Sequence, residues 1–214
     1  MSAAKRKRRP HERARASVRR ARSIASVRSG GPLGLRLRAP RSLLLIVDVH
    51  ERLAPAVPDA KPVIDRCAAL MRAAAQLSVP TLISEHCPER LGPTVKPLRA
   101  LARSEDILGK VHFSCADEPA LLQRIASLAR PQVVIAGMEA HVCVLQTALG
   151  LAERGYRVCV VADATGSRTS VSHATAMERL RMAEIMVVTT EMVLFEWLER
   201  ADRPEFRALL ALIK

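Results

Sequence analysis

The stretch SLLLIVD, residues 42–48, decides the fold of this chain. It is a short apolar run, and such runs are typical of strands buried on both faces of a parallel sheet. Asp48 interrupts the run at its end, where a carboxylate must be paired or solvated. The segment therefore predicts an interior strand that ends at a polar position.

Strand-like and helix-like patterns alternate outward from this segment. Residues 59–77 place apolar side chains on one helical stripe, and TLISE (81–85) predicts a second strand. HCPERLGPTVKP (86–97) predicts a long irregular loop, of the kind that is often functional. The remaining pattern predicts strands at 106–110, 131–137, 156–163 and 184–190, helices at 117–129, 142–154 and 170–183, and two short C-terminal helices separated at Pro204.

This order of elements predicts one doubly wound, three-layer, Rossmann-like α/β domain over residues 41–214. Its sheet is expected to be roughly six-stranded and mostly parallel, with helices on both faces. The length of 214 residues leaves room for a substantial single core.

The net charge of +13 is concentrated at the N-terminus. Residues 1–40 hold 13 Lys or Arg and one acid, whereas 41–214 hold 21 bases and 20 acids. Dense like charge with few large apolar residues predicts a disordered tail at 1–40. Three interpretations compete for this tail. They are an in-frame extension that is not normally translated, which we favour, an arm for nucleic acid or acidic surfaces, and an organelle transit peptide.

Composition limits the partners of the chain. No run approaches the roughly 18–20 apolar residues that a membrane span needs. Aromatic residues that could stack on bases are scarce, so we expect nucleic-acid contact only through residues 1–40.

Five widely spaced cysteines without a CxxC pair predict neither disulfides nor structural zinc, and favour a reducing, cytoplasmic compartment. No His, Asp or Cys cluster has metal-ligand spacing, so we expect no metal and no cofactor.

Functional side chains are expected at the carboxyl edge of the sheet, because ligands of open parallel sheets bind there. Asp48 ends the first predicted strand, Lys110 ends the third, and GMEAHVCV (137–144) follows the fourth. The other polar residues at strand ends are Glu85, His86 and Asp163. An acid, an amine and a thiol therefore meet at one edge of one sheet.

Cys143 is the strongest candidate for a nucleophile. It lies within about one turn of a predicted helix start, and a helix N-terminus or a neighbouring lysine brings the pKa of a thiol down to about 3.5–7.5. The alternative is a small, buried apolar residue. That alternative suits Cys67, Cys115 and Cys159 better, because they lie within apolar helix or strand patterns.

The partners of the thiol also have structural alternatives. Asp48 could cap the following turn or shuttle a proton, and Lys110 could be a solvated lysine at a strand end. His50 and His141 lie within three residues of the acid and the thiol. Either histidine could line the pocket or be an ordinary surface or core residue.

At these same residues the chain resembles the isochorismatase-like cysteine hydrolases, over about 42–214. LLLIVDVHERLAPAV (43–57) resembles the opening strand of that family with its catalytic acid. GKVHFS (109–114) resembles its lysine segment, VVIAGMEAHVCV (133–144) its nucleophile turn, and VVADATGSRT (160–169) a later loop. SEHCPERLGPTV (84–95) and the C-terminal segment narrow the resemblance to a subgroup of unassigned substrate, related to isochorismatase-domain proteins.

The resemblance implies a catalytic triad and a thioester route. Asp48 would take the proton of the thiol and later help to activate water. Lys110 would stabilise the thiolate and hold Asp48. Cys143 would attack a carbonyl of a small amide-type or related acyl substrate, and water would then cleave the thioester.

The resemblance also implies an oxyanion site at the nucleophile turn. A cis peptide bond between Met138 and Glu139 would aim the backbone N–H of Glu139, with that of Cys143, at the developing oxyanion. His50, His86, Phe113 and His141 are the possible pocket-lining residues. The chain departs from many relatives at two of these positions, with His50 and His86 where Gln is usual, and also at Ala140, where Thr is common.

Two branches of the family fit poorly. The metal site of nicotinamidases needs histidines near the second strand, and this region offers only His86. Isochorismate cleavage needs no thiol. The predicted function is therefore a cysteine hydrolase of C–N amide-type or related bonds. The competing hypothesis is a non-catalytic, oligomeric binding protein of the same fold, whose basic tail contacts nucleic acid. The apolar helix at 142–154 favours a homo-oligomer in both cases.

Overall fold

The computed structural model describes residues 35–213, which form one compact unit. The predicted tail lies outside the described residues as far as Gly34, so the competing interpretations of that segment stay predictions. Within residues 35–213, no helix is long and apolar enough to cross a bilayer.

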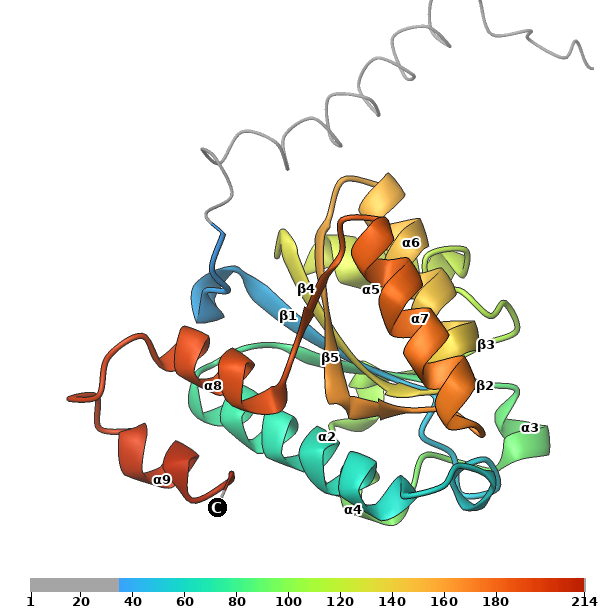
Figure 1. Cartoon of the computed structure of the whole chain (residues 1–214), viewed down its shortest axis with the longest axis horizontal. Helices are drawn as coiled ribbons and strands as arrows, with labels where there is room; N and C mark the ends of the chain where they lie inside the picture. Colours follow the sequence, from blue (N-terminus) through green and yellow to red (C-terminus); the bar gives the residue numbers. More distant parts are fainter. Residues whose placement is uncertain (1–34, 214) are drawn as a thin grey trace, which may run out of the picture. The chain divides into compact units, whose positions relative to one another are not determined.

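A six-stranded parallel sheet forms the centre of the molecule (Figure 1). The order of its strands is β3-β2-β1-β4-β5-β6, and every neighbouring pair is parallel. The prediction of a doubly wound α/β domain is therefore confirmed. The strands are β1 (Ser42–Val47), β2 (Thr81–His86), β3 (Ile107–Lys110), β4 (Gln132–Met138), β5 (Arg157–Gly166) and β6 (Met186–Val188).

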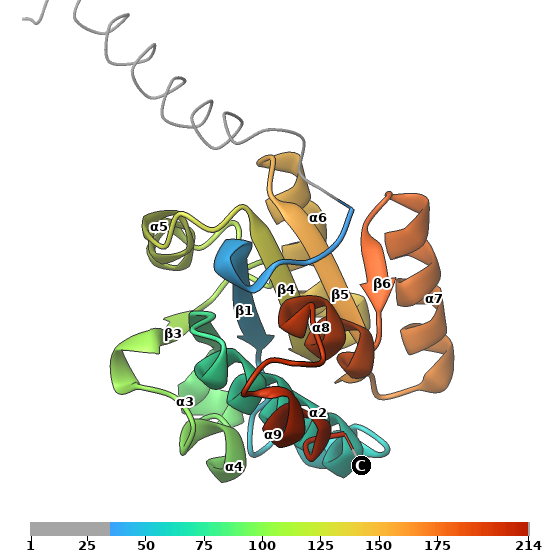
Figure 2. The same ribbon diagram turned by 90° about the vertical axis from the view of Figure 1, so that its left-hand side faces the viewer.

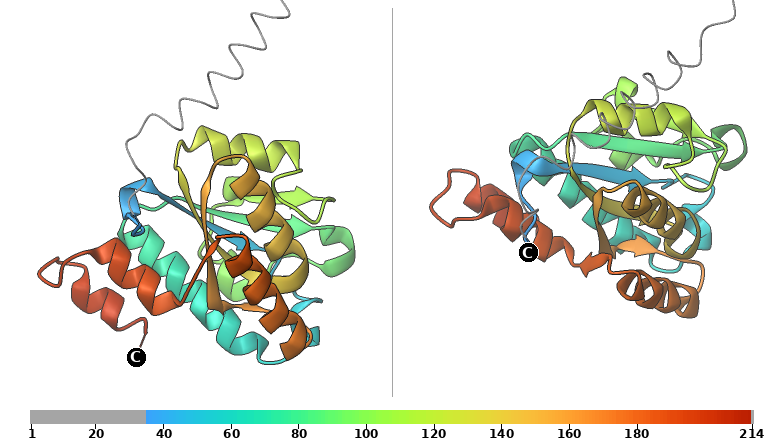
Figure 3. Two further views of the ribbon diagram at one scale, coloured as in Figure 1. Left: turned by 45° about the horizontal axis from the view of Figure 1, so that its top comes forward. Right: turned by 90° about the horizontal axis from the view of Figure 1, so that it is seen from above.

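Helices cover both faces of the sheet, because β1 is apolar on both sides. Leu44 and Ile46 face a core with α2 (Ala60–Gln76) and α8 (Thr190–Leu198), whereas Leu43 and Leu45 face α5 (Pro119–Ser127), α6 (Leu145–Glu153) and α7 (Ser170–Met182). Figures 2 and 3 show these two layers from other sides. The alternation follows from the period of two along a strand.

The segment 86–97 differs from the irregular loop that we expected. It contains two single-turn helices, α3 (Pro88–Leu91) and α4 (Lys96–Arg99). Each has a proline in its first turn. Backbone N–H groups in the first turn have no acceptor within the helix, so proline, which lacks this group, is tolerated there.

The compact unit begins at Leu35, ahead of the predicted boundary at residue 41. Leu37 and Ala39 are buried, at 1% and 3% exposure. The backbone N–H of Arg38 donates to Oε1 of Gln132 over 2.9 Å, and the indole of Trp197 donates to Ser42 Oγ over 2.9 Å. This short segment closes one end of the sheet, although its Arg-rich composition resembles that of the tail.

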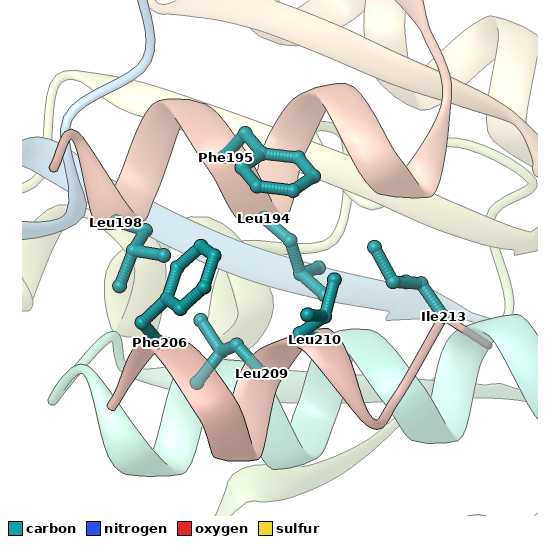
Figure 4. A pocket seen from close by; sticks show the side chains of 7 residues that line it. All are labelled: Leu194, Phe195, Leu198, Phe206, Leu209, Leu210 and Ile213. Atoms are coloured by element: carbon teal, nitrogen blue, oxygen red, sulfur yellow. The ribbon is translucent and has the colours of Figure 1, made fainter. Parts of the chain in front are cut away.

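A small apolar hollow lies between α8 and α9 (Phe206–Leu210), as Figure 4 shows. Its lining carries no titratable side chain, so it is a packing feature of the C-terminal helices. The lining residues are Leu194, Phe195, Leu198, Phe206, Leu209, Leu210 and Ile213.

The carboxyl ends of β1 and β4 form the switch point of the sheet, where the chain leaves β1 toward β2 but continues from β4 toward β5. Gly137 allows the two strands to approach there. Its φ is +122°, and a Cβ atom at this position would lie 2.0 Å from the carbonyl oxygen of Val47. Only glycine fits, and the segment that follows it is brought directly against the end of β1.

Candidate active site

Asp48 lies at the end of β1 in the left-handed region of backbone space, with φ of 51°. Aspartate tolerates this conformation better than most residues. Its backbone N–H donates to Ser84 O over 3.1 Å, and its side chain is held at 1% exposure. The strand end therefore presents a buried carboxylate that needs partners.

Lys110 supplies the charge that this carboxylate needs. Its Nζ donates to Asp48 Oδ2 over 2.6 Å, and to the carbonyl oxygens of His112 and Phe113 over 3.1 and 3.0 Å. All three ammonium protons are thereby satisfied. Burial lowers the pKa of Lys110, but Asp48 and the neighbouring Cys115 and Cys143 together raise it above its ordinary value, so the ammonium is charged at neutral pH.

Ser84 binds the other oxygen of the same carboxylate. Its hydroxyl donates to Asp48 Oδ1 over 2.7 Å, and the residue is fully buried in β2, directly opposite Val47. The sequence analysis did not identify Ser84. The available signal was a polar residue directly after the apolar pair Leu82 and Ile83, at the position paired with the end of β1.

Cys143 lies in a π-helical turn, Ala140–Val144, that continues into α6. Its side chain is 7% exposed and interacts with both Asp48 and Lys110. The three residues that the sequence singled out are thus brought together at the switch point.

The expectation of an ionised thiol is not supported. Burial, and then the negative charge of Asp48, raise the pKa of Cys143 well above its usual range, although Lys110 opposes them. A helix N-terminus and a neighbouring lysine both lower the pKa of a thiol, and these are the two features that the sequence indicates. Desolvation, and a carboxylate that already pairs with the lysine, raise the pKa and have no signal in the sequence. The resting group is a neutral thiol beside the side chain of Asp48.

A second thiol, that of Cys115, interacts with the same Asp48 and Lys110 side chains. Cys115 is fully buried, and burial followed by the charge of Asp48 raises its pKa to about 11. The hydroxyls of Ser84 and Thr147 face its sulfur, and Thr147 Oγ1 also accepts from the backbone N–H of Cys115 over 2.9 Å. Thr147 is fully buried as well.

The turn before Cys143 contains a cis peptide bond between Met138 and Glu139. The Glu139 side chain turns away toward the loop after β5, where the guanidinium of Arg168 donates to both of its carboxylate oxygens, over 2.9 and 2.6 Å. The backbone N–H of Arg168 donates to the same carboxylate over 3.0 Å. These bonds lower the pKa of Glu139 and tie the nucleophile turn to β5. The proposed oxyanion donors, Glu139 and Cys143, lie on this turn.

The four possible pocket-lining residues have different surroundings. His50 is fully buried: its Nδ1 lies 2.6 Å from Gly92 O, and its Nε2 accepts from the backbone N–H of His86 over 2.9 Å. It therefore braces the loop after β2 and does not line an open pocket. His141 is partly exposed, and its Nδ1 lies 3.0 Å from Ser167 Oγ.

His86 and Phe113 lie beside Lys110. Their ring centroids are 5.2 Å apart, and Phe113 is 51% exposed. Burial, and then the charge of Lys110, lower the pKa of His86, so its imidazole is neutral at pH 7. This aromatic pair is the part of the expected lining that faces solvent next to the triad.

The remaining strand-end acids serve the fold. Glu85 Oε1 accepts from the backbone N–H and the hydroxyl of Thr94, over 2.6 and 2.7 Å. Asp163 Oδ1 accepts from the same two groups of Thr190, over 2.7 and 3.0 Å, at the start of α8. In the part of the chain that the structure describes, no group of three His, Cys, Asp or Glu side chains could hold a metal ion.

A thiol, a carboxylate and an amine at the switch point of a parallel sheet define the class of this molecule. It is a doubly wound α/β protein with a buried, cysteine-centred candidate active site. Comparison with known proteins identifies its family. The family model of the isochorismatase domain matches residues 42–192. The chain belongs to the isochorismatase family.

The most similar relatives include two vertebrate proteins. Isochorismatase domain-containing protein 2 from Bos taurus is 36% identical over 176 residues, which cover 81% of this chain and 83% of that protein. Its counterpart from Danio rerio is 34% identical over 179 residues, which cover 83% and 89%.

Solved structures share the fold. One described as the MAR1 ribonuclease from Caenorhabditis elegans is 32% identical, with a TM-score of 0.78, covering 83% of this chain and 92% of that one. The YcaC protein from Escherichia coli, described as an octameric hydrolase of unknown specificity, has a TM-score of 0.76 at 23% identity. The match covers 84% of this chain and 97% of that one.

Proposed function

We propose that this protein is a cysteine-dependent hydrolase that cleaves a small amide-type or related acyl substrate through a thioester. The observation that carries the proposal is the Cys143 thiol beside the buried Asp48–Lys110 ion pair. A buried ion pair of this kind is costly to desolvate, so it is weak evidence for stability, and a cluster of perturbed titratable groups marks a candidate functional site.

In the first step, the sulfur of Cys143 attacks the substrate carbonyl while its proton moves to Asp48. Backbone N–H groups of Glu139 and Cys143 stabilise the oxyanion. As the carbonyl re-forms, the C–N bond breaks, and the proton on Asp48 passes to the departing nitrogen. The products are an acyl thioester on Cys143 and a free amine.

In the second step, water attacks the thioester and gives one proton to Asp48. The C–S bond breaks, the acid is released, and the proton returns to the sulfur. A neutral resting thiol suits this cycle better than a thiolate, because Asp48 then receives and returns one proton in each half. Lys110 stays charged throughout and keeps the carboxylate in place.

A panel of small amides and carbamates tests the proposal. Wild type is expected to hydrolyse at least one compound, and Cys143→Ala to lose that activity. Cys67→Ala is the matched control, because Cys67 is also a buried free cysteine but lies on α2, in the core on the other face of the sheet. Equal hydrolysis by wild type and Cys143→Ala would show that the thiol is not the nucleophile.

We further propose a homo-oligomer in the cytoplasm. The octameric state described for the E. coli relative and the apolar α6 support assembly, and five free cysteines support a reducing compartment. Light scattering is expected to give a multiple of the 23.4 kDa chain mass. A monomeric mass would contradict assembly.

Ribonuclease activity is the second candidate, because the C. elegans relative at 32% identity is described as a ribonuclease. Two observations weigh against it. The candidate nucleophile is 7% exposed, and the chain has five aromatic residues in total for stacking on bases. Incubating wild type and Cys143→Ala with single-stranded RNA decides between the candidates, because cleavage that requires Cys143 would favour the ribonuclease.

A further inference from the structure

We propose that Arg168 is a positioning residue, which acts through Glu139 to hold the nucleophile turn in the register that an oxyanion site requires. This role rests on the proposed function, because it concerns the oxyanion site of that same mechanism. It gives a largely exposed side chain of the loop after β5 a part in catalysis.

The register of the nucleophile turn is set by the backbone carbonyl of Glu139. In an α-helix, this carbonyl would accept from the N–H four residues ahead, which is that of Cys143. Here it accepts from Val142 over 3.1 Å and from Val144 over 3.2 Å, and the second bond spans five residues, as in a π-helix. The turn thus releases the Cys143 N–H from the acceptor that it would have in an α-helix. A backbone N–H released in this way can donate to a developing oxyanion.

Glu139 is held in place through its side chain, which is 6% exposed. The guanidinium of Arg168 donates from Nε and from Nη2, over 2.9 and 2.6 Å, and the backbone N–H of Arg168 adds a third bond over 3.0 Å. A two-pronged contact of this kind fixes the orientation of a carboxylate as well as its position. Arg168 also lowers the pKa of Glu139, so the carboxylate is ionised at pH 7.

The preceding residue of the same loop makes a second contact with the turn. Ser167 is 6% exposed, and its Oγ lies 3.0 Å from Nδ1 of His141. The loop thus holds the turn at two points. The contact of Arg168 is the charged one and comprises three hydrogen bonds, so loss of its guanidinium is expected to loosen Glu139. The turn can then relax to an α-helical register, in which the Glu139 carbonyl accepts from the N–H of Cys143.

Two reactions of Cys143 separate this role from a general effect on the thiol. p-Nitrophenyl acetate acetylates the sulfur through a tetrahedral oxyanion and releases p-nitrophenol. Iodoacetamide alkylates the sulfur by displacing iodide at a saturated carbon, without an oxyanion. Acetylation is followed by the p-nitrophenol released in the first turnover, after subtraction of the rate of Cys143→Ala, and alkylation by peptide mass spectrometry.

Arg168→Met is expected to slow the two reactions of Cys143 unequally. Acetylation at pH 7 should fall at least about tenfold, a part of the roughly 10²–10³-fold that one oxyanion donor contributes. Alkylation should stay within about threefold of wild type. If the methionine protein does not fold, Arg168→Lys replaces it, with an expected loss of at least about threefold in acetylation, because lysine cannot make the two-pronged contact.

Arg154→Met is the matched control. Arg154 pairs with Asp117 over 2.9 Å at the C-terminal end of α6, so the substitution removes an arginine–carboxylate contact at the end of the helix away from the turn. Both reactions are expected to stay within about twofold of wild type.

Two results would overturn the role of Arg168. Acetylation of Arg168→Met at the wild-type rate would mean that the contact does not position the turn. Equal slowing of acetylation and alkylation would mean that the contact acts on the thiol and not on the oxyanion. The proposed function fails separately: if wild type and Cys143→Ala release p-nitrophenol at the same rate, Cys143 is not the nucleophile, and the role of Arg168 falls with it.

Discussion

Replacing Lys110 by Met tests the energetics of the buried ion pair. The substitution removes the donor at 2.6 Å and leaves the Asp48 carboxylate, 1% exposed, with Ser84 as a hydrogen-bond partner. Breaking a buried pair by removing one partner costs about 3–5 kcal/mol. For a domain of this size, that loss lowers Tm by roughly 6–20 °C.

The double variant Asp48→Asn/Lys110→Met is expected to recover part of that loss. It carries no uncompensated charge, so it should cost at least about 2 kcal/mol less than the sum of the two single variants. Urea unfolding of the four proteins at pH 7 measures the cycle. The pH is suitable because the raised pKa of Lys110 keeps its contribution present below about pH 10.4. The contribution is lost only as the pH rises through the folded-state pKa.

If the losses of unfolding free energy in the two single variants simply add up in the double variant, the expected coupling is absent. A coupling free energy near zero would mean that the two side chains do not stabilise each other, and a Lys110→Met loss below about 1 kcal/mol would mean that the carboxylate is not truly buried. Either result would remove the argument that the pair is held for function.

Two further substitutions test other parts of the structure. Arg168→Met should cost about 1–3 kcal/mol at pH 7, because Glu139 loses the guanidinium and keeps the backbone N–H of residue 168 as a donor. Arg168 lowers the pKa of Glu139, so the difference in unfolding free energy between wild type and variant is fully present above about pH 4.3. It should shrink in urea unfolding at pH 3, and a difference that stays the same would contradict the role of Arg168. Leu37→Ala should cost about 2–5 kcal/mol in the same assay, whereas Leu35→Ala, 87% exposed, should cost almost nothing; equal losses would contradict the domain boundary at residue 35.

The fold could be predicted from the sequence because the local apolar patterns and the rules of sheet topology indicate the same structure. An apolar run at β1 requires cover on both faces, and the alternation of helices and strands supplies it. The same topology brings Asp48, Lys110 and Cys143 to one edge, since all three follow strand ends.

Features that depend on burial or on distant partners could not be predicted. Residues 35–40 look like the tail by composition, yet Leu37 is part of the core. The neutral state of Cys143 depends on desolvation, which has no signal in a linear pattern. The hydrogen bond between Arg168 and Glu139 joins residues 29 positions apart in the chain, and that between Ser84 and Asp48 joins residues 36 positions apart.

The state of Cys143 after exposure of the protein to p-nitrophenyl acetate shows whether this thiol is the nucleophile. In Asp48→Asn, the carboxylate charge that raises the pKa of Cys143 is gone while Lys110 still lowers it, so the sulfur can attack this activated ester without a base. The base that activates water for thioester hydrolysis is missing. Peptide mass spectrometry is therefore expected to find an acetyl group that persists on Cys143 in Asp48→Asn and turns over in wild type. An unmodified Cys143 in both proteins, with acetylation confined to the more exposed Cys87, would contradict the account.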